Sequence, residues 1–160
     1  EARGRWIDAA LGSMQQSSQR AADILSTHQA SASTDVTGFG LLGHLVEMTR
    51  ASGVDAELEI DALPVLDGAE DCVARGVVSS LQPANLRLKR ALKDQAGVID
   101  HPRYPLLFDP QTAGGLLASV PPGEAEACLA ALKAAGYHAS AIIGRITPQG
   151  DALAPISIKH

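Results

Sequence analysis

The segment over residues 34–45 constrains the fold of this chain more than any other part of its sequence. It reads Thr-Asp-Val-Thr-Gly-Phe-Gly-Leu-Leu-Gly-His-Leu, so an aspartate precedes three closely spaced glycines and a stretch with helical spacing. Glycines at such short intervals predict a tight turn, and the apolar positions after them predict an amphipathic helix. We therefore expect a short strand over 30–36, a turn just after Asp35, and a helix over 41–51.

A second string repeats the combination of an acid, a turn and glycines. It reads Asp-Pro-Gln-Thr-Ala-Gly-Gly-Leu-Leu over residues 109–117 and leads into a predicted buried strand over 114–120. Polar side chains at a strand entrance, here Asp109, Gln111 and Thr112, either reach a cleft or satisfy the turn. The spacing alone favours the turn.

The first string has the chemistry of a metal and phosphate site. A carboxylate can hold a divalent cation, and free N–H groups at a helix start can face phosphate oxygens. Asp35 is therefore a candidate Mg²⁺ ligand, but it could equally cap the following turn. Gly38, Gly40 and Gly43 could donate N–H groups or permit close packing, and the pattern alone favours packing. The letters G-x-G-x-x-G here do not indicate a dinucleotide site, because no suitable acid ends a parallel strand about 20 residues later.

The remaining sequence alternates helices and strands and predicts one compact α+β domain over residues 1–160. Short loops and a final strand-turn-strand favour a mixed β-sheet of about four to five strands packed with helices. The further elements that we expect are a helix over 5–27 with a weak centre, a strand over 56–61, short helices and turns over 62–105, a helix over 124–135, and strands over 140–146 and 154–158 joined by a turn at 148–151.

Composition argues against several classes of function. A formal net charge of −5 disfavours general binding to nucleic acid or to an anionic membrane, and no apolar run is long enough to span a bilayer. The basic cluster over 87–93 is predicted to be a solvated helix face. Cys72 and Cys128 lack metal or redox spacing, so we interpret them as reduced, buried residues of a cytoplasmic protein. For His44, close to Glu47 on a helix face, a structural role is favoured over metal binding.

Taken together, the two strings closely resemble those of the selenophosphate synthetase (selenide, water dikinase) family. The resemblance extends over nearly the whole chain, including the closing strand around residues 142–146, and matches only the C-terminal domain of that family, which belongs to the aminoimidazole ribonucleotide synthetase superfamily. It implies that an N-terminal domain for ATP binding and dimerisation lies outside this sequence. The start at Glu1, rather than at Met, fits an excised fragment.

The resemblance also implies an activity and a set of site residues. Members of the family convert hydrogen selenide, ATP and water into selenophosphate, AMP and phosphate, with Mg²⁺ and K⁺, and the full-length protein is expected to be a homodimer. Their catalytic Cys or Sec and Lys lie outside this chain, so we expect no catalytic residue here and an inactive fragment. The residues implied here are Asp35 for the metal, the phosphate-facing Thr37, Gly38 and Gly40, and Asp109 and Thr112 for the cofactor.

Two other functions stay open at the level of the sequence. The chain could be the same domain of another ATP-using member of the superfamily, such as a ribonucleotide synthetase, a thiamine-phosphate kinase or a hydrogenase-maturation protein. The string over 109–115 argues against these. The chain could also be a free-standing, non-catalytic domain, which the sequence upstream of Glu1 would decide.

Overall fold

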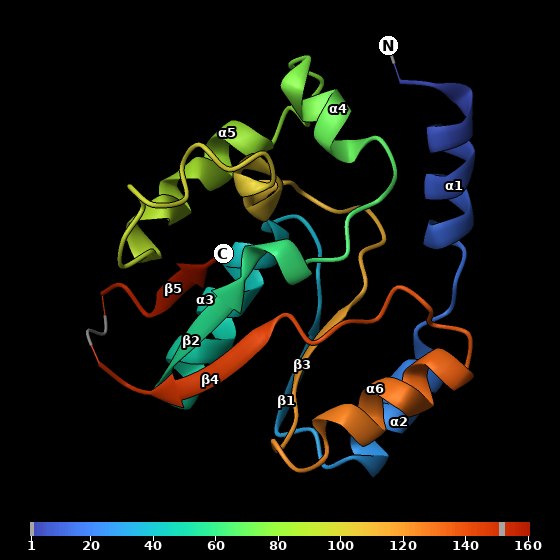
Figure 1. Cartoon of the computed structure of the whole chain (residues 1–160), viewed down its shortest axis with the longest axis vertical. Helices are drawn as coiled ribbons and strands as arrows, with labels where there is room; N and C mark the ends of the chain where they lie inside the picture. The colour runs from blue at the N-terminus through green and yellow to red at the C-terminus, as the bar shows by residue number, and fades with distance from the viewer. Residues whose placement is uncertain (1, 151–152) are drawn as a thin grey trace.

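A computed structural model describes residues 2–150 and 153–160 (Figure 1). Helices and strands alternate along much of the chain, as predicted, and the fold class is α+β. In chain order the elements are α1 (Gly4–Met14), α2 (Gln19–Thr27), β1 (Ala32–Asp35), α3 (Gly40–Ser52), β2 (Val54–Glu59), η1 (Ile60–Ala62), α4 (Ala69–Ala74), α5 (Gln82–Asn85), η2 (Leu86–Ala91), η3 (Tyr104–Phe108), β3 (Leu116–Ser119), α6 (Ala125–Ala134), β4 (Gly144–Pro148) and β5 (Ile156–Lys159), where η denotes a 3₁₀ helix.

The strands form two small sheets rather than the one mixed sheet that we expected. β1 pairs with β3 in antiparallel fashion, whereas β2 lies between an antiparallel β4 and a parallel β5. The predicted mixture of parallel and antiparallel pairing is therefore confirmed. The sheets stay separate because α3, which connects β1 to β2, packs against both of these strands.

Helix α3 carries much of the core, as expected of the amphipathic helix predicted over 41–51. Leu42, Leu45, Val46 and Thr49 are all buried. They meet apolar residues from η1, from η3 and from the three-stranded sheet, whose most deeply buried members are Leu58, Ile60, Leu107, Phe108 and Ile156. The helix ends where Gly53 adopts φ 63°, a left-handed conformation that glycine reaches at little cost.

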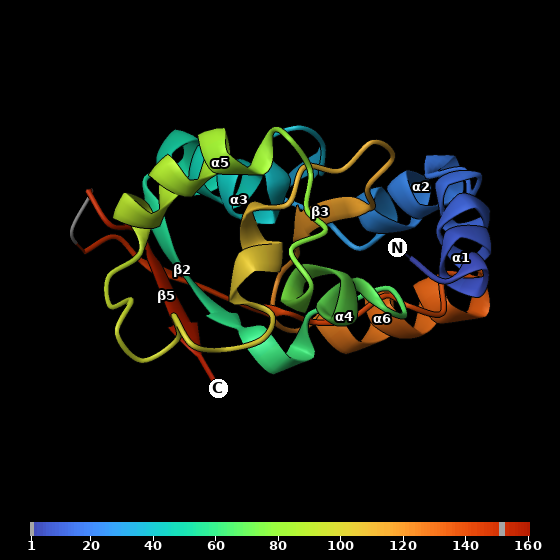
Figure 2. The same cartoon turned by 90° about the horizontal axis from the view of Figure 1, so that it is seen from above.

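The first predicted helix is interrupted at its weak centre. α1 ends at Met14 and α2 begins at Gln19, so the Gln-Ser run forms the break. Both views show α1, α2 and α6 gathered at one end of the molecule, away from the β2–β5 pair (Figures 1 and 2). No helix in the described part of the chain is long and apolar enough to cross a membrane.

Two predicted features differ in detail from the structure, and a third lies partly outside the described residues. The strand over 114–120 is only half-buried, with Leu117 as its one buried residue, because it pairs with β1 alone. The strand over 140–146 begins only at Gly144. The predicted turn at 148–151 extends beyond the described residues at Asp151.

Candidate functional site

The two acid-and-glycine strings lie side by side. Strand pairing sets Asp35 opposite Leu116, and the Val36 N–H donates to the Gly115 carbonyl at 2.9 Å. Past the strand ends, the Gln111 N–H donates to the Thr37 carbonyl at 3.0 Å. The fold therefore brings residues that are about 75 positions apart into one turn-against-turn arrangement at the end of β1.

Glycine is required where these backbones approach most closely. A Cβ on Gly114 would overlap the Val36 carbonyl oxygen. Gly40 has φ +69°, and a Cβ there would lie 2.9 Å from the Asp109 carbonyl oxygen. Its own N–H donates to the Thr37 carbonyl at 3.0 Å, which closes the turn before α3. Gly38 differs, since it is exposed and no heavy atom would lie within 4 Å of its Cβ.

Asp35 stands at the end of β1 with its side chain exposed. Within residues 2–150 and 153–160, no hydrogen bond or ion pair engages its carboxylate, and only its carbonyl accepts, from the Thr34 hydroxyl at 3.1 Å. An exposed carboxylate without a partner is available to an outside cation. Its alternative role, capping the turn through its own side chain, would require a bond that the described residues do not show.

Asp109 lies nearby in a more buried setting. Burial raises the pKa of its carboxyl group, and the Gln111 amide, which donates to Asp109 Oδ2 at 3.2 Å, opposes that rise. Asp109, Pro110 and the exposed Thr112 line a depression of about 370 Å³ whose other wall includes Cys72. Asp109 and Thr112 of the second string therefore reach a surface hollow, whereas Gln111 serves the turn.

His44 has the structural role that its sequence position favoured. The ring is buried, and its Nε2 accepts from the Thr37 N–H at 3.0 Å. The Thr37 hydroxyl lies 3.1 Å from the same nitrogen, and Glu47 Oε2 lies 3.4 Å from Nδ1. His44 thus stabilises the turn, and the Thr37 N–H is already hydrogen-bonded within the protein.

Asn85 is a site residue that the sequence did not reveal. It lies in the irregular segment over 62–105, on the short helix α5, and is buried. Its Nδ2 donates to the Gly38 carbonyl at 2.9 Å and to the Phe108 carbonyl at 3.1 Å. No local pattern signals such a contact, because an asparagine in a Pro- and Gly-rich stretch usually serves a turn.

A comparison with models of protein families identifies the family of this chain. The model described as "AIR synthase related protein, C-terminal domain" matches residues 8–154. The chain belongs to this family.

A curated relative agrees with this placement of the AIR synthase related domain, and solved structures share its fold. A "Selenide, water dikinase" of Geobacter metallireducens is 39% identical over 147 residues, which cover 92% of the chain and 43% of that protein. The chain therefore spans less than half the length of this relative. The hydrogenase maturation protein HypE has a similar fold, with a TM-score of 0.60 at 22% identity over 86% of the chain and 36% of its own. A HypE structure in complex with ATP gives a TM-score of 0.57 at 21% identity, covering 82% and 32% of the two chains.

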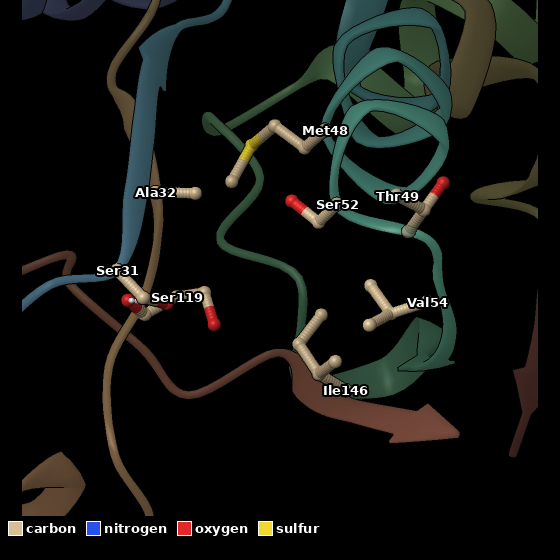
Figure 3. A pocket seen from close by; sticks show the side chains of 8 residues that line it. All are labelled: Ser31, Ala32, Met48, Thr49, Ser52, Val54, Ser119 and Ile146. Atoms are coloured by element: carbon tan, nitrogen blue, oxygen red, sulfur yellow. Dashed lines mark hydrogen bonds between the residues drawn. The ribbon is translucent and has the colours of Figure 1, made fainter. Parts of the chain in front are cut away.

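A second hollow in the AIR synthase related domain lies away from the paired strings. Figure 3 shows Met48 and Ser52 of α3 pointing toward Ala32, Ser31 and Ser119. These residues, with Thr49, line a cavity of about 100 Å³. Ser31 precedes β1, so this cavity lies at the end of the strand opposite to Asp35. It lacks a charged residue among those that line it and is not part of the candidate site.

A third group, Asp61, His101 and His160, has one ligand atom from each residue within 4.8 Å of the others. Its hydrogen bonds disfavour a metal. The Arg103 N–H donates to His101 Nδ1 at 3.1 Å, so the proton of the neutral ring lies on Nε2, which faces Asp61 Oδ1 at 3.2 Å. A histidine that binds a metal through one ring nitrogen usually donates the N–H of the other. Here the other nitrogen, His101 Nδ1, accepts a hydrogen bond instead. We interpret Asp61 and His101 as a hydrogen-bonded pair, against which the His160 ring packs while its Nε2 lies 2.7 Å from the Gly97 carbonyl.

The cysteines and the basic cluster match most of their predictions. Cys128 is buried, and burial together with nearby Glu124 raises the pKa of its thiol, so it is unreactive. Cys72 is only half-buried. The basic cluster over 87–93 is solvent-facing, but Lys93 also donates to the buried Asp55 Oδ2 at 2.6 Å. The reading as a purely solvated face therefore missed one structural ion pair.

Proposed function

We propose that this chain is the C-terminal domain of a selenide, water dikinase and that Asp35 supplies one Mg²⁺ ligand to its ATP-phosphate site. The observation that carries the proposal is the exposed, unpartnered Asp35 carboxylate beside the second acidic string. Similarity to a "Selenide, water dikinase" over 92% of the chain supports the reaction class.

The proposed reaction converts hydrogen selenide, ATP and water into selenophosphate, AMP and phosphate. Its reactants are anionic, so cations must neutralise the phosphate oxygens before selenide can approach. Mg²⁺ typically takes one or two carboxylates and fills its remaining positions with water and phosphate oxygens. A single exposed aspartate next to a glycine turn fits that donor set. The N-terminal domain would supply the catalytic Cys or Sec, the Lys and the remaining metal ligands.

The other proposed binding residues would contribute in different ways. Gly38 is the phosphate-facing amide whose N–H has no hydrogen bond within the described chain. The Thr37 and Gly40 amides are engaged internally, and the Thr37 hydroxyl also lies 3.1 Å from His44 Nε2, so Thr37 would contribute by ordering the turn and Gly40 through close packing. Asp109 and Thr112 would border the bound nucleotide from the neighbouring depression. We also propose K⁺ as a cofactor, because a further cation would help to neutralise the anionic reactants, and we assign no ligands to it.

The test is the pair of variants Asp35→Asn and Asp35→Ala in the full-length protein. Selenophosphate formation, followed by ³¹P NMR, is expected to fall by roughly a hundredfold or more, because a lost metal ligand removes stabilisation of developing charge. The thermal unfolding midpoint should stay unchanged, since the carboxylate makes no hydrogen bond or ion pair in the described chain. Asp100→Asn, at another exposed aspartate, is the matched control. Near-normal turnover of both Asp35 variants would refute the metal role.

A further inference from the structure

One buried side-chain amide joins the two strings of the candidate site. Asn85 is 4% exposed, and its Nδ2 donates to the Gly38 carbonyl at 2.9 Å and to the Phe108 carbonyl at 3.1 Å. Those acceptors are 47 and 23 residues away along the chain. An asparagine NH₂ group has two hydrogens, so each carbonyl takes one and the donor is fully used.

The two carbonyls belong to the parts of the backbone that carry the acids. Gly38 lies in the turn that follows Asp35, and Phe108 directly precedes Asp109. Both bonds start from one nitrogen atom of a planar amide, so they tie the position of one turn to that of the other. No other described side chain donates both to the first string and to the backbone directly before the second.

We propose that Asn85 is a positioning residue that sets the separation between the Asp35 turn and the Asp109 turn. The expected effect of Asn85 on turnover rests on the proposed function. The coupling of the two turns by Asn85 does not depend on it. Asn85 itself touches no reacting group. It acts through the backbone, and metal sites lose affinity and rate when the groups that orient their ligands are removed.

Gln82 offers a matched control on the same helix. It is also buried, at 6% exposed, and its Nε2 donates to a single carbonyl, that of Pro105, at 2.9 Å. Gln82→Ala therefore removes a buried amide and one backbone contact without touching the Gly38 turn. Asn85→Ala removes both contacts, and Asn85→Ser keeps a small hydroxyl donor if the alanine variant unfolds.

The first readout is hydrogen–deuterium exchange of the full-length protein, measured by mass spectrometry. In Asn85→Ala or Asn85→Ser, peptides covering 36–43 and 107–115 are expected to exchange about tenfold faster, and together, because both turns lose the same donor. In Gln82→Ala the 36–43 peptide should keep its normal rate. Faster exchange in only one string of the Asn85 variants, or in both strings of Gln82→Ala, would overturn the proposal.

The second readout is selenophosphate formation with the Mg²⁺ concentration varied. The Asn85 variants are expected to lose about tenfold or more in kcat and to need more Mg²⁺ for half-maximal rate, while Gln82→Ala stays within about twofold. An Asn85 variant with the same kinetics as Gln82→Ala would overturn the positioning role. If the Asp35 variants keep full turnover, the proposed function fails instead, and the exchange experiment alone decides whether Asn85 couples the strings.

Discussion

At the scale of single residues, two glycines of one short motif have different duties. Gly40 has a positive φ and lies against the backbone of residues 107–109, whereas Gly38 is exposed and has space for a side chain. The left-handed conformation is unfavourable for residues with a Cβ, which clashes with the following carbonyl. Glycine therefore permits close backbone packing at position 40, whereas at position 38 it leaves the backbone accessible to solvent.

The paired substitutions Gly40→Ala and Gly38→Ala test this division. Gly40→Ala is expected to lower the free energy of unfolding by about 2 kcal/mol, because strain at positive φ adds to a Cβ contact with the Asp109 carbonyl. Gly38→Ala should change it by about 0.5 kcal/mol or less. Urea unfolding followed by circular dichroism measures both. Equal effects of the two substitutions would show that the close approach at Gly40 carries no cost.

At the scale of elements, the central strand β2 is tied to its surroundings by a buried carboxylate. Asp55 on β2 is 1% exposed, and its Oδ2 accepts from Lys93 Nζ at 2.6 Å and from the Gly150 N–H at 3.0 Å. The hydrogen bond from Lys93 is the main cause that lowers the pKa of Asp55, against an opposing effect of burial. One carboxylate thus joins three segments: β2, the chain after η2, and the turn after β4.

This arrangement predicts a pH dependence of stability. Because the pKa of Asp55 is lowered on folding from its ordinary value of 3.8, the native state binds the proton less tightly than the unfolded state. The stabilisation is therefore complete above the unfolded pKa and is lost as the pH falls through the folded one. Lys93→Met should unfold at a lower urea concentration than the native protein at pH about 6, and the difference should shrink toward pH about 2.5.

The control for this experiment is Lys89→Met, which removes an exposed lysine of the same basic cluster. Its urea midpoint is expected to follow that of the native protein across the whole range of pH. A difference between Lys93→Met and the native protein that stayed constant with pH would show that the ion pair with Asp55 is not its cause.

At the scale of the whole molecule, the candidate site is open on one side. Asp35, Gly38 and Thr112 are exposed, and the chain spans 43% of its relative from Geobacter metallireducens. Mg²⁺ carried by a nucleotide usually needs more than one carboxylate, together with groups that hold the phosphates. Under the proposed function, the single carboxylate of this domain would complete such a shell only when a second domain meets it.

This chain by itself should therefore bind Mg²⁺ and ATP weakly. In isothermal titration calorimetry its dissociation constant for Mg–ATP is expected to be at least about tenfold higher than that of the full-length protein, because most of the ligands would lie in the other domain. Asp35→Asn in the isolated chain should change that weak binding little. Tight, stoichiometric binding by this chain alone would contradict a site shared between two domains.

The sequence by itself determined the features that depend on near neighbours. The inner face of α3, its end at Gly53 and the break between α1 and α2 all follow from periodicity and from glycine or serine chemistry within a few residues. The acidic strings were recognisable for the same reason, since each is a continuous run. In the structure Asp35 and Thr112 are exposed and Asp109 lines a surface hollow, whereas His44 of the first string is buried.

Only the tertiary structure decided which distant segments meet. The division into two sheets, the amide of Asn85 shared by Gly38 and Phe108, and the ion pair of Lys93 with Asp55 join residues 23 or more positions apart. Such contacts depend on how whole elements pack, and no local spacing encodes them. Sequence patterns thus identified the acids of the candidate site, and packing decided how far apart their backbones are held.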